Sequence, residues 1–155
     1  MLSCSSLENM YLNLIRPLLE YRGGVWDNST AELTNDIESV QNEAARIVSV
    51  ATKLCNIHTL LADLRWDTLA CRRRKHRLTL LYKMKHGLAP NYLTHVIPNQ
   101  SQDRYPLRNA ESIHLLKVKT QQYAASFLPA TIREWKSLSP ETQQADTVHI
   151  FKSKL

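Results

Sequence analysis

The sequence predicts a mainly α-helical protein, folded as a single domain over residues 1–155 with about five to seven helices. Three observations lead to this fold class. The chain has 155 residues, 43% of them hydrophobic, which suits one domain with its own core. Apolar residues recur at helical spacing along most of the chain, and only 3 glycines interrupt it. A small β-hairpin near residues 106–119 is the one non-helical element that the pattern allows.

The first predicted helix covers residues 6–20. Its apolar side chains share helical spacing: Leu7, Tyr11, Leu14 and Leu18. Pro17 cannot donate a backbone hydrogen bond, so we expect it to kink this helix or to mark its last turn. Gly23-Gly24 then breaks the chain, and Asn28, Ser29 or Thr30 can cap the next helix with a side-chain oxygen.

The clearest helical pattern lies within residues 33–51. Its apolar residues alternate at spacings of four and three: Leu33, Ile37, Val40, Ala44, Ile47 and Ala51. The residues between them are mostly polar, so we expect the apolar stripe to face the core of the domain. A dimeric coiled coil is the alternative, although the stripe spans fewer than three heptads.

Two helices are predicted next. A short one near residues 57–64 ends at Arg65-Trp66, and a longer one is capped by Asp67 or Thr68 and stops at Gly87. The apolar face of the longer helix consists of Leu78, Leu81 and Met84. A different face is expected to be polar and cationic, with Arg72, Lys75, Thr79, Lys83 and His86.

The C-terminal part is predicted to continue in short helices. Residues 92–97 allow one or two turns, residues 99–110 form a loop, and residues 113–119 alternate weakly enough for a strand. A helix over residues 123–138 is interrupted at Pro129, and a terminal helix covers residues 148–155. The tryptophans are expected to anchor the core rather than to stack on bases: Trp26, Trp66 and Trp135.

Positive charge is concentrated in the middle of the chain. Residues 51–100 contain 9 basic and 2 acidic side chains, whereas residues 1–50 contain 3 basic and 7 acidic ones. The densest cluster runs from Arg72 to Arg77. Such a cluster is typical of a protein that binds a polyanion, but a solvent-exposed helix face would give the same pattern. Charge alone does not separate these two interpretations.

No catalytic or metal-binding pattern is present in the sequence. The 6 histidines and 3 cysteines match neither zinc-ligand spacing nor a thioredoxin motif, and Gly-x-Ser-x-Gly is absent. Paired carboxylates for two-metal chemistry are also missing. We therefore expect no cofactor. No run approaches 18 uncharged apolar residues, so we expect no membrane span. The N-terminal residues lack the pattern of a secretion signal and the number of cysteines is odd, so we expect an intracellular protein, nuclear or cytoplasmic, with reduced thiols.

Several sequence blocks occur in an order that resembles a known family. The blocks are Leu14–Tyr21, Val25-Trp26-Asp27, Glu38-x-x-Gln41-x-x-Ala44-Ala45-Arg46, Leu64–Leu69, Arg72–Leu88, Ser126–Leu138 and Phe151–Leu155. Together they are similar to the region after the polymerase palm in reverse transcriptases of non-LTR retrotransposons (LINE-type elements). The similarity spans roughly residues 11–155. Two departures are Arg65, which replaces the glycine of a Leu-Gly-Trp block, and Glu43, which stands where a basic residue is common.

The resemblance implies a catalytically inactive fragment. The palm aspartates, with their Asp-Asp turn, and the N-terminal endonuclease of the family have no counterpart in this sequence. The matching region corresponds to the thumb and tail, which are expected to hold template and primer. We therefore expect non-specific binding of the RNA or DNA backbone, and a palm domain as a partner if a longer polyprotein exists. The residues expected to bind are Arg72, Arg73, Lys75, Arg77 and Lys83.

A second hypothesis is a helical protein-interaction module with no nucleic-acid role. The apolar stripe within residues 33–51 motivates it, because such a stripe can bind another helix. In this case the basic cluster is a solvated face. The third hypothesis, an enzyme, is disfavoured because the necessary carboxylates are missing. The sequence leaves the oligomeric state open.

Overall fold

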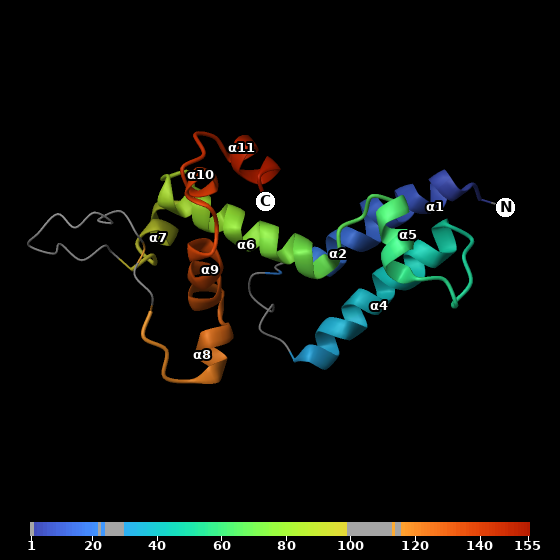
Figure 1. Cartoon of the computed structure of the whole chain (residues 1–155), viewed down its shortest axis with the longest axis horizontal. Helices are drawn as coiled ribbons and strands as arrows, with labels where there is room; N and C mark the ends of the chain where they lie inside the picture. Colours follow the sequence, from blue (N-terminus) through green and yellow to red (C-terminus); the bar gives the residue numbers. More distant parts are fainter. Residues whose placement is uncertain (1, 22, 24–29, 99–112, 114–115) are drawn as a thin grey trace, which may run out of the picture. The chain divides into compact units, whose positions relative to one another are not determined.

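The computed structural model describes residues 2–21, 23, 30–98, 113 and 116–155 (Figure 1). These residues are mainly helical and contain no strand, which confirms the predicted fold class. They form two compact units, Met1–Arg73 and Arg74–Leu155, so the boundary falls inside one helix. The assignment of residues 1–155 to a single domain stays a prediction. Most of the predicted hairpin lies outside the described residues.

The first unit begins with a continuous helix of three parts: α1 (Cys4–Met10), a π-helical turn η1 (Tyr11–Ile15) and α2 (Arg16–Glu20). The helix therefore matches the predicted span and continues past Pro17. A proline inside a helix crowds the carbonyl four residues earlier, which here belongs to Asn13 in the π-helical turn. The wider turn next to Pro17 is thus a local adjustment that keeps the helix intact.

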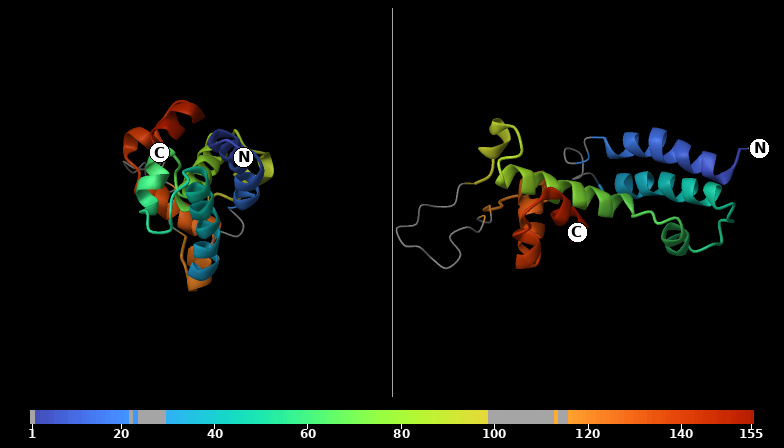
Figure 2. Two further views of the ribbon diagram at one scale, coloured as in Figure 1. Left: turned by 90° about the vertical axis from the view of Figure 1, so that its right-hand side faces the viewer. Right: turned by 90° about the horizontal axis from the view of Figure 1, so that it is seen from above.

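Two further helices complete most of the first unit: α4 (Ala31–Val48) and α5 (Ile57–Asp63). Thr30 caps α4, because its hydroxyl accepts the amide N–H of Leu33 at 3.4 Å. α1 and α4 run side by side in opposite directions (Figure 2). The buried core of this unit consists of Tyr11, Ala45, Val48, Leu61 and Trp66.

The predicted core face of α4 is wrong for three of its six predicted residues, although Ala44 does pack against the core. Leu33, Val40 and Ile47 are 53%, 43% and 59% exposed. The buried residues of this helix are instead Gln41, Ala45 and Val48. The amide of Gln41 accepts a hydrogen bond from the Tyr11 hydroxyl (2.9 Å) and donates to the carbonyl of Asp67 (3.0 Å). A side-chain amide that both donates and accepts a hydrogen bond can be buried at little cost in free energy. The spacing of apolar residues does not predict such a buried residue, because glutamine is polar.

The second unit contains most of α6 (Leu69–Lys85) and the short helices that follow it. These are α7 (Asn91–Thr94), α8 (Gln121–Ala125), α9 (Phe127–Lys136), α10 (Pro140–Gln143) and α11 (Val148–Ser153). The break predicted at Pro129 lies slightly earlier, at Ser126 between α8 and α9. Tyr82 packs on Phe151, with ring centroids 4.5 Å apart. The core of this unit consists of Leu78, Leu81, Tyr82, Ile113, Ile132, Trp135, Ala145 and Phe151.

Three successive helices end in the same way. After α6, Gly87 adopts φ 66°, and the amide of Leu88 donates to the carbonyl of Lys83 at 2.8 Å. This is a Schellman motif, and it confirms the stop predicted at Gly87. Val50 after α4 and Arg65 after α5 hold the equivalent position, with φ 50° and 56°. Both are L-residues in the left-handed region, so these two helix ends carry backbone strain.

Candidate nucleic-acid interface

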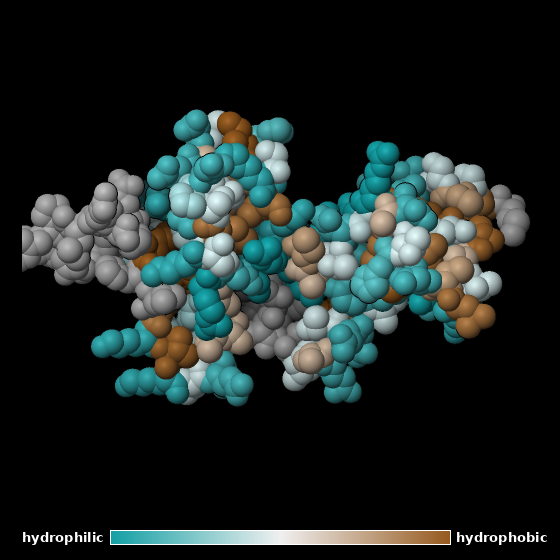
Figure 3. All heavy atoms as spheres, in the orientation of Figure 1, coloured by the Kyte–Doolittle hydropathy of each residue, from teal (hydrophilic) through white to brown (hydrophobic). Residues whose placement is uncertain are grey.

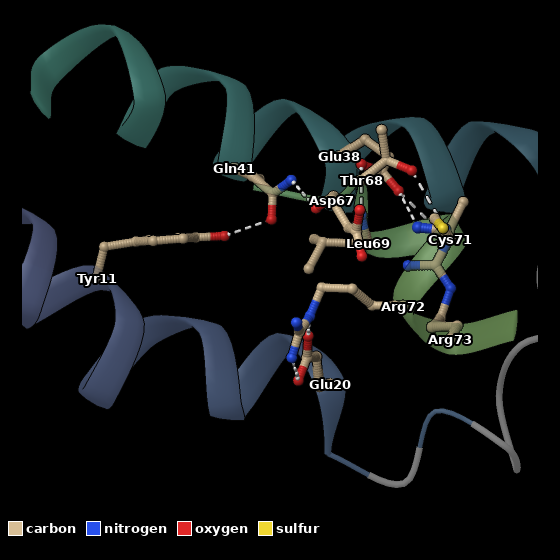
Figure 4. Close-up of polar contacts among 11 residues, drawn as sticks. Tyr11, Glu20, Glu38, Gln41, Asp67, Thr68, Leu69, Cys71, Arg72 and Arg73 are labelled. Carbon is tan, nitrogen blue, oxygen red and sulfur yellow. Dashed lines mark hydrogen bonds and ion pairs between the residues drawn. The ribbon is translucent and has the colours of Figure 1, made fainter. Parts of the chain in front are cut away.

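At the N-terminus of the basic helix α6, a carboxylate from another helix accepts hydrogen bonds from the first backbone amides. Thr68 caps the helix, since its hydroxyl accepts the amide N–H of Cys71 at 3.2 Å. Glu38 on α4 accepts the amides of Leu69 (3.2 Å) and Ala70 (2.6 Å) (Figure 4). The N-terminus of a helix favours a negative charge. Glu38 supplies that charge, and these two amides are therefore already engaged.

Arg73 lies at the same place and is almost completely buried. Its side chain is 3% exposed, and Nη2 lies 3.6 Å from Oε1 of Glu38. Figure 4 shows Arg73 directed toward α4. Burying a guanidinium is costly unless a carboxylate compensates its charge. In this structure Arg73 therefore connects α6 to α4 and is not displayed to solvent.

Arg72 forms a two-point pair with Glu20 at the end of α2. Nε and Nη2 both donate to the carboxylate, the second at 3.1 Å (Figure 4). The hydrogen bond to Glu20 raises the pKa of Arg72 above its ordinary value. A fork-to-fork pair of this kind fixes the guanidinium in one orientation. The charge of Arg72 is thus compensated inside the first unit.

Arg77 is engaged in the same way inside the second unit. Its Nη2 lies 2.8 Å from Oε1 of Glu134 on α9, and its side chain is 13% exposed. Arg74 shares this carboxylate, with Nε 3.7 Å from Oε2. Glu134 therefore holds two cations of α6 against α9.

The remaining two predicted residues, Lys75 and Lys83, are half-buried on α6. The described residues provide no ion pair for Lys83. Thr79, expected on the cationic face, is in fact buried, and its hydroxyl donates to the carbonyl of Lys75 at 2.7 Å. His86 stacks on Tyr82, and its pKa is lowered by burial and by Lys85. The predicted cationic face is therefore not one continuous row of exposed charges.

A different set of cations lies exposed on the second unit. Residues 74–155 contain 13 basic and 5 acidic side chains, a formal charge of +8, whereas residues 1–73 carry a formal charge of −2. Hydrophilic residues dominate much of the visible surface (Figure 3). The exposed lysines and arginines outside the predicted site include Lys85, Lys117, Lys119, Arg133, Lys136, Lys152 and Lys154.

Sequence reasoning missed these residues because it grouped charge by position along the chain. Counted by consecutive segments, residues 101–155 carry only +3 and stand apart from the +7 of residues 51–100, whereas the compact unit that begins at Arg74 joins them with the later basic residues of α6 into one unit of +8. The residue counts contain the positive charge of residues 74–155, but the boundary at Arg73 that groups these residues is a property of the fold.

The described residues contain neither a metal-binding cluster nor a membrane-spanning helix. Among the described residues, no group of three or more histidine, cysteine or acidic side chains could hold a metal ion. No helix in the described part of the chain is long and apolar enough to cross a membrane.

Comparisons of the chain with protein-family models, curated proteins and solved structures gave no match.

Proposed function

We propose that this chain binds the backbone of RNA or DNA without sequence specificity and has no catalytic activity of its own. The observation that carries the proposal is the +8 formal charge of residues 74–155, much of it on exposed side chains. Lysine and arginine side chains that neutralise phosphates release condensed counterions, which gives affinity without reading bases. The acidic first unit does not contribute to this effect.

A salt titration tests the proposal. The affinity of the full chain for a labelled duplex and for a single-stranded oligonucleotide is measured between low and near-physiological salt. We expect log Kd to rise linearly with the logarithm of the salt concentration, and equally for unrelated sequences. Failure to form any complex at near-physiological salt would contradict the proposal. A clear preference for one sequence would contradict its non-specific character.

We also propose that the chain is a fragment of a retrotransposon reverse transcriptase. One structural feature supports the resemblance. Arg65, which replaces the glycine of the Leu-Gly-Trp block, has φ 56°, a backbone conformation that glycine adopts without strain. The tryptophan of that block, Trp66, stacks on Tyr11 with ring centroids 4.6 Å apart. The block thus has the form of a tight helix end followed by a core residue.

Two experiments test this origin and the absence of catalysis. In a primer-extension assay with Mg²⁺, the purified chain should incorporate no nucleotide, because the palm carboxylates of the family have no counterpart here. Incorporation that tracks with the chain through purification would overturn the proposal. Genomic sequence upstream of Met1 should encode a palm with an Asp-Asp turn in the same frame, and such a palm would be a partner.

A protein-interaction module is the second candidate function. The specific observation in its favour is the exposed face of α4, where Leu33, Val40 and Ile47 lie at the surface. Apolar stripes of this length on a solvent-facing helix are typical of surfaces that bind another helix. Binding of a helical peptide that is lost on substitution of these residues would establish this function.

A further inference from the structure

We propose that the exposed face of α4 binds an amphipathic helix with a basic edge, supplied by a partner protein. This inference rests on the second candidate function and adds the chemistry of the partner. It concerns the acidic first unit and is independent of the cations on the second unit.

The apolar part of this surface follows the axis of α4. Leu33, Val40 and Ile47 are exposed and take no part in the core of the first unit. Ile37 lies on the same face and is half-buried, whereas Ala44, between Val40 and Ile47, packs against the core and borders the exposed stripe. Anchors at this spacing are those that a partner helix contacts when it packs along another helix.

The two edges of the stripe differ in chemistry. One edge is the buried row Gln41, Ala45 and Val48, which packs into the unit. The other edge faces solvent, and helical geometry places three acidic residues along it: Glu32, Asp36 and Glu43. All three are exposed, and no basic residue lies between them on this edge.

The acidic edge is mostly uncompensated. Glu43 pairs with Arg46, with Oε1 and Nη1 2.8 Å apart. For Glu32 and Asp36, the described residues provide no ion pair. A partner helix lying on Leu33, Val40 and Ile47 places its own flanking side chains beside these carboxylates. Opposite charges at such flanking positions favour association, and like charges oppose it.

This charge pattern selects among the occupants of the stripe. A second copy of the chain, packed α4 against α4, would present the same acidic edge and repel. A nucleic acid offers phosphates and is repelled as well. A helix with lysine or arginine beside its apolar face is complementary to both parts of the surface. The structure therefore assigns a basic amphipathic helix as the partner.

Two synthetic helical peptides test this assignment. They share one leucine and isoleucine stripe and differ only in flanking residues, which are lysine in one and glutamate in the other. Their affinities for the full chain are measured by fluorescence anisotropy at two salt concentrations. We expect the lysine peptide to bind at least tenfold tighter, and its advantage to shrink at high salt.

Variants on the exposed surface locate the binding. Val40→Ser should weaken both peptides, whereas Asp36→Lys should remove or reverse the preference for the lysine peptide. Leu54→Ser is the matched control, because Leu54 is 96% exposed outside α4 and its loss should change neither affinity. Circular dichroism checks that every variant retains its helical content.

The outcomes separate this inference from the function on which it rests. Equal affinities for the two peptides, both reduced by Val40→Ser, would overturn the basic partner and retain the interaction function. If neither peptide binds, both are overturned. Concentration-dependent sedimentation of the chain that Val40→Ser abolishes would identify a second copy as the occupant and would also overturn the inference.

Discussion

The carboxylate of Glu38 lies 3.6 Å from the guanidinium of Arg73 and joins α4 to the first turn of α6. The same carboxylate accepts the amides of Leu69 and Ala70. One side chain thus caps a helix from outside it and compensates a buried cation. A residue that the sequence pattern placed among polar spacers is therefore central to the first unit.

Removing the charge of Glu38 should destabilise the chain. Glu38→Gln leaves the buried guanidinium of Arg73 without its carboxylate, and loss of one partner of such a pair costs about 3 kcal/mol. Urea denaturation followed by circular dichroism measures the change. Asp36→Asn, which changes an exposed carboxylate beyond the first turn of the same helix, is the control and should change stability by less than about 0.5 kcal/mol. Equal effects of the two substitutions would show that Glu38 is not a structural carboxylate.

Glycine at position 50 should stabilise the chain. Val50 has φ 50°, which a β-branched residue adopts only with strain, and it is highly exposed. We expect Val50→Gly to raise the free energy of unfolding by about 1 kcal/mol, because the relief of strain exceeds the added entropy of the unfolded chain. The thermal midpoint measures this change.

The reciprocal substitution provides a control for the helix ends. Gly87 has φ 66°, and nothing lies within 4 Å of a Cβ added there. Gly87→Ala should therefore destabilise by about 1 kcal/mol through backbone strain alone. A stabilised Gly87→Ala variant would mean that these left-handed positions do not limit stability.

Stability should fall at high pH partly through Tyr11. Burial raises the pKa of Tyr11 from 10.0 to about 12. Because the folded-state pKa is the higher one, the contribution is complete below pH 10 and is lost as the pH rises toward 12. The loss is on the order of 2 kcal/mol.

Comparison with Tyr11→Phe isolates this group. The variant should be less stable at neutral pH, because Gln41 loses the hydrogen bond from the phenol. Its stability should decline less steeply between pH 10 and pH 12 than that of the unmodified chain. Parallel slopes in chemical denaturation over this range would exclude Tyr11 as the source of the pH dependence.

Charge reversal on the second unit should weaken nucleic-acid binding and reduce its salt dependence. Lys117 and Lys119 are exposed outside the helices, and each lost phosphate contact lowers the log–log slope by about 0.9 on duplex DNA. The Lys117→Glu and Lys119→Glu double variant should therefore bind more weakly. Lys53→Glu, an exposed cation of the first unit, is the matched control and should bind like the unmodified chain.

Arg72 requires a different experiment, because Arg72→Glu would place its carboxylate beside that of Glu20 and destabilise the first unit by repulsion. The exchange Glu20→Arg with Arg72→Glu restores the pair with the charges reversed. We expect this double variant to recover stability and to retain nucleic-acid affinity. Recovered stability with lost affinity would instead place Arg72 in the interface, as the sequence predicts. Salt titrations and urea denaturation of the same samples provide both measurements.

Local sequence signals determined most of the helical organisation. Thr30 and Thr68 cap α4 and α6 within three residues of the amides they bind, and Gly87 ends α6. Trp66 and Trp135 are buried, as large aromatic side chains in a small helical protein are expected to be. The caps and the helix end depend on residues close together in the chain, and the burial of the tryptophans was expected from their residue type, so a sequence pattern contains this information.

Tertiary structure alone decided which face of α4 is buried and which arginines are compensated. The orientation of α4 depends on hydrogen bonds of Gln41 to Tyr11, 30 residues away, and to Asp67, 26 residues away. Arg72 and Arg77 pair with carboxylates 52 and 57 residues away. Apolar periodicity and charge counts treat each side chain by its type, whereas burial and charge compensation depend on the partner that folding brings beside it.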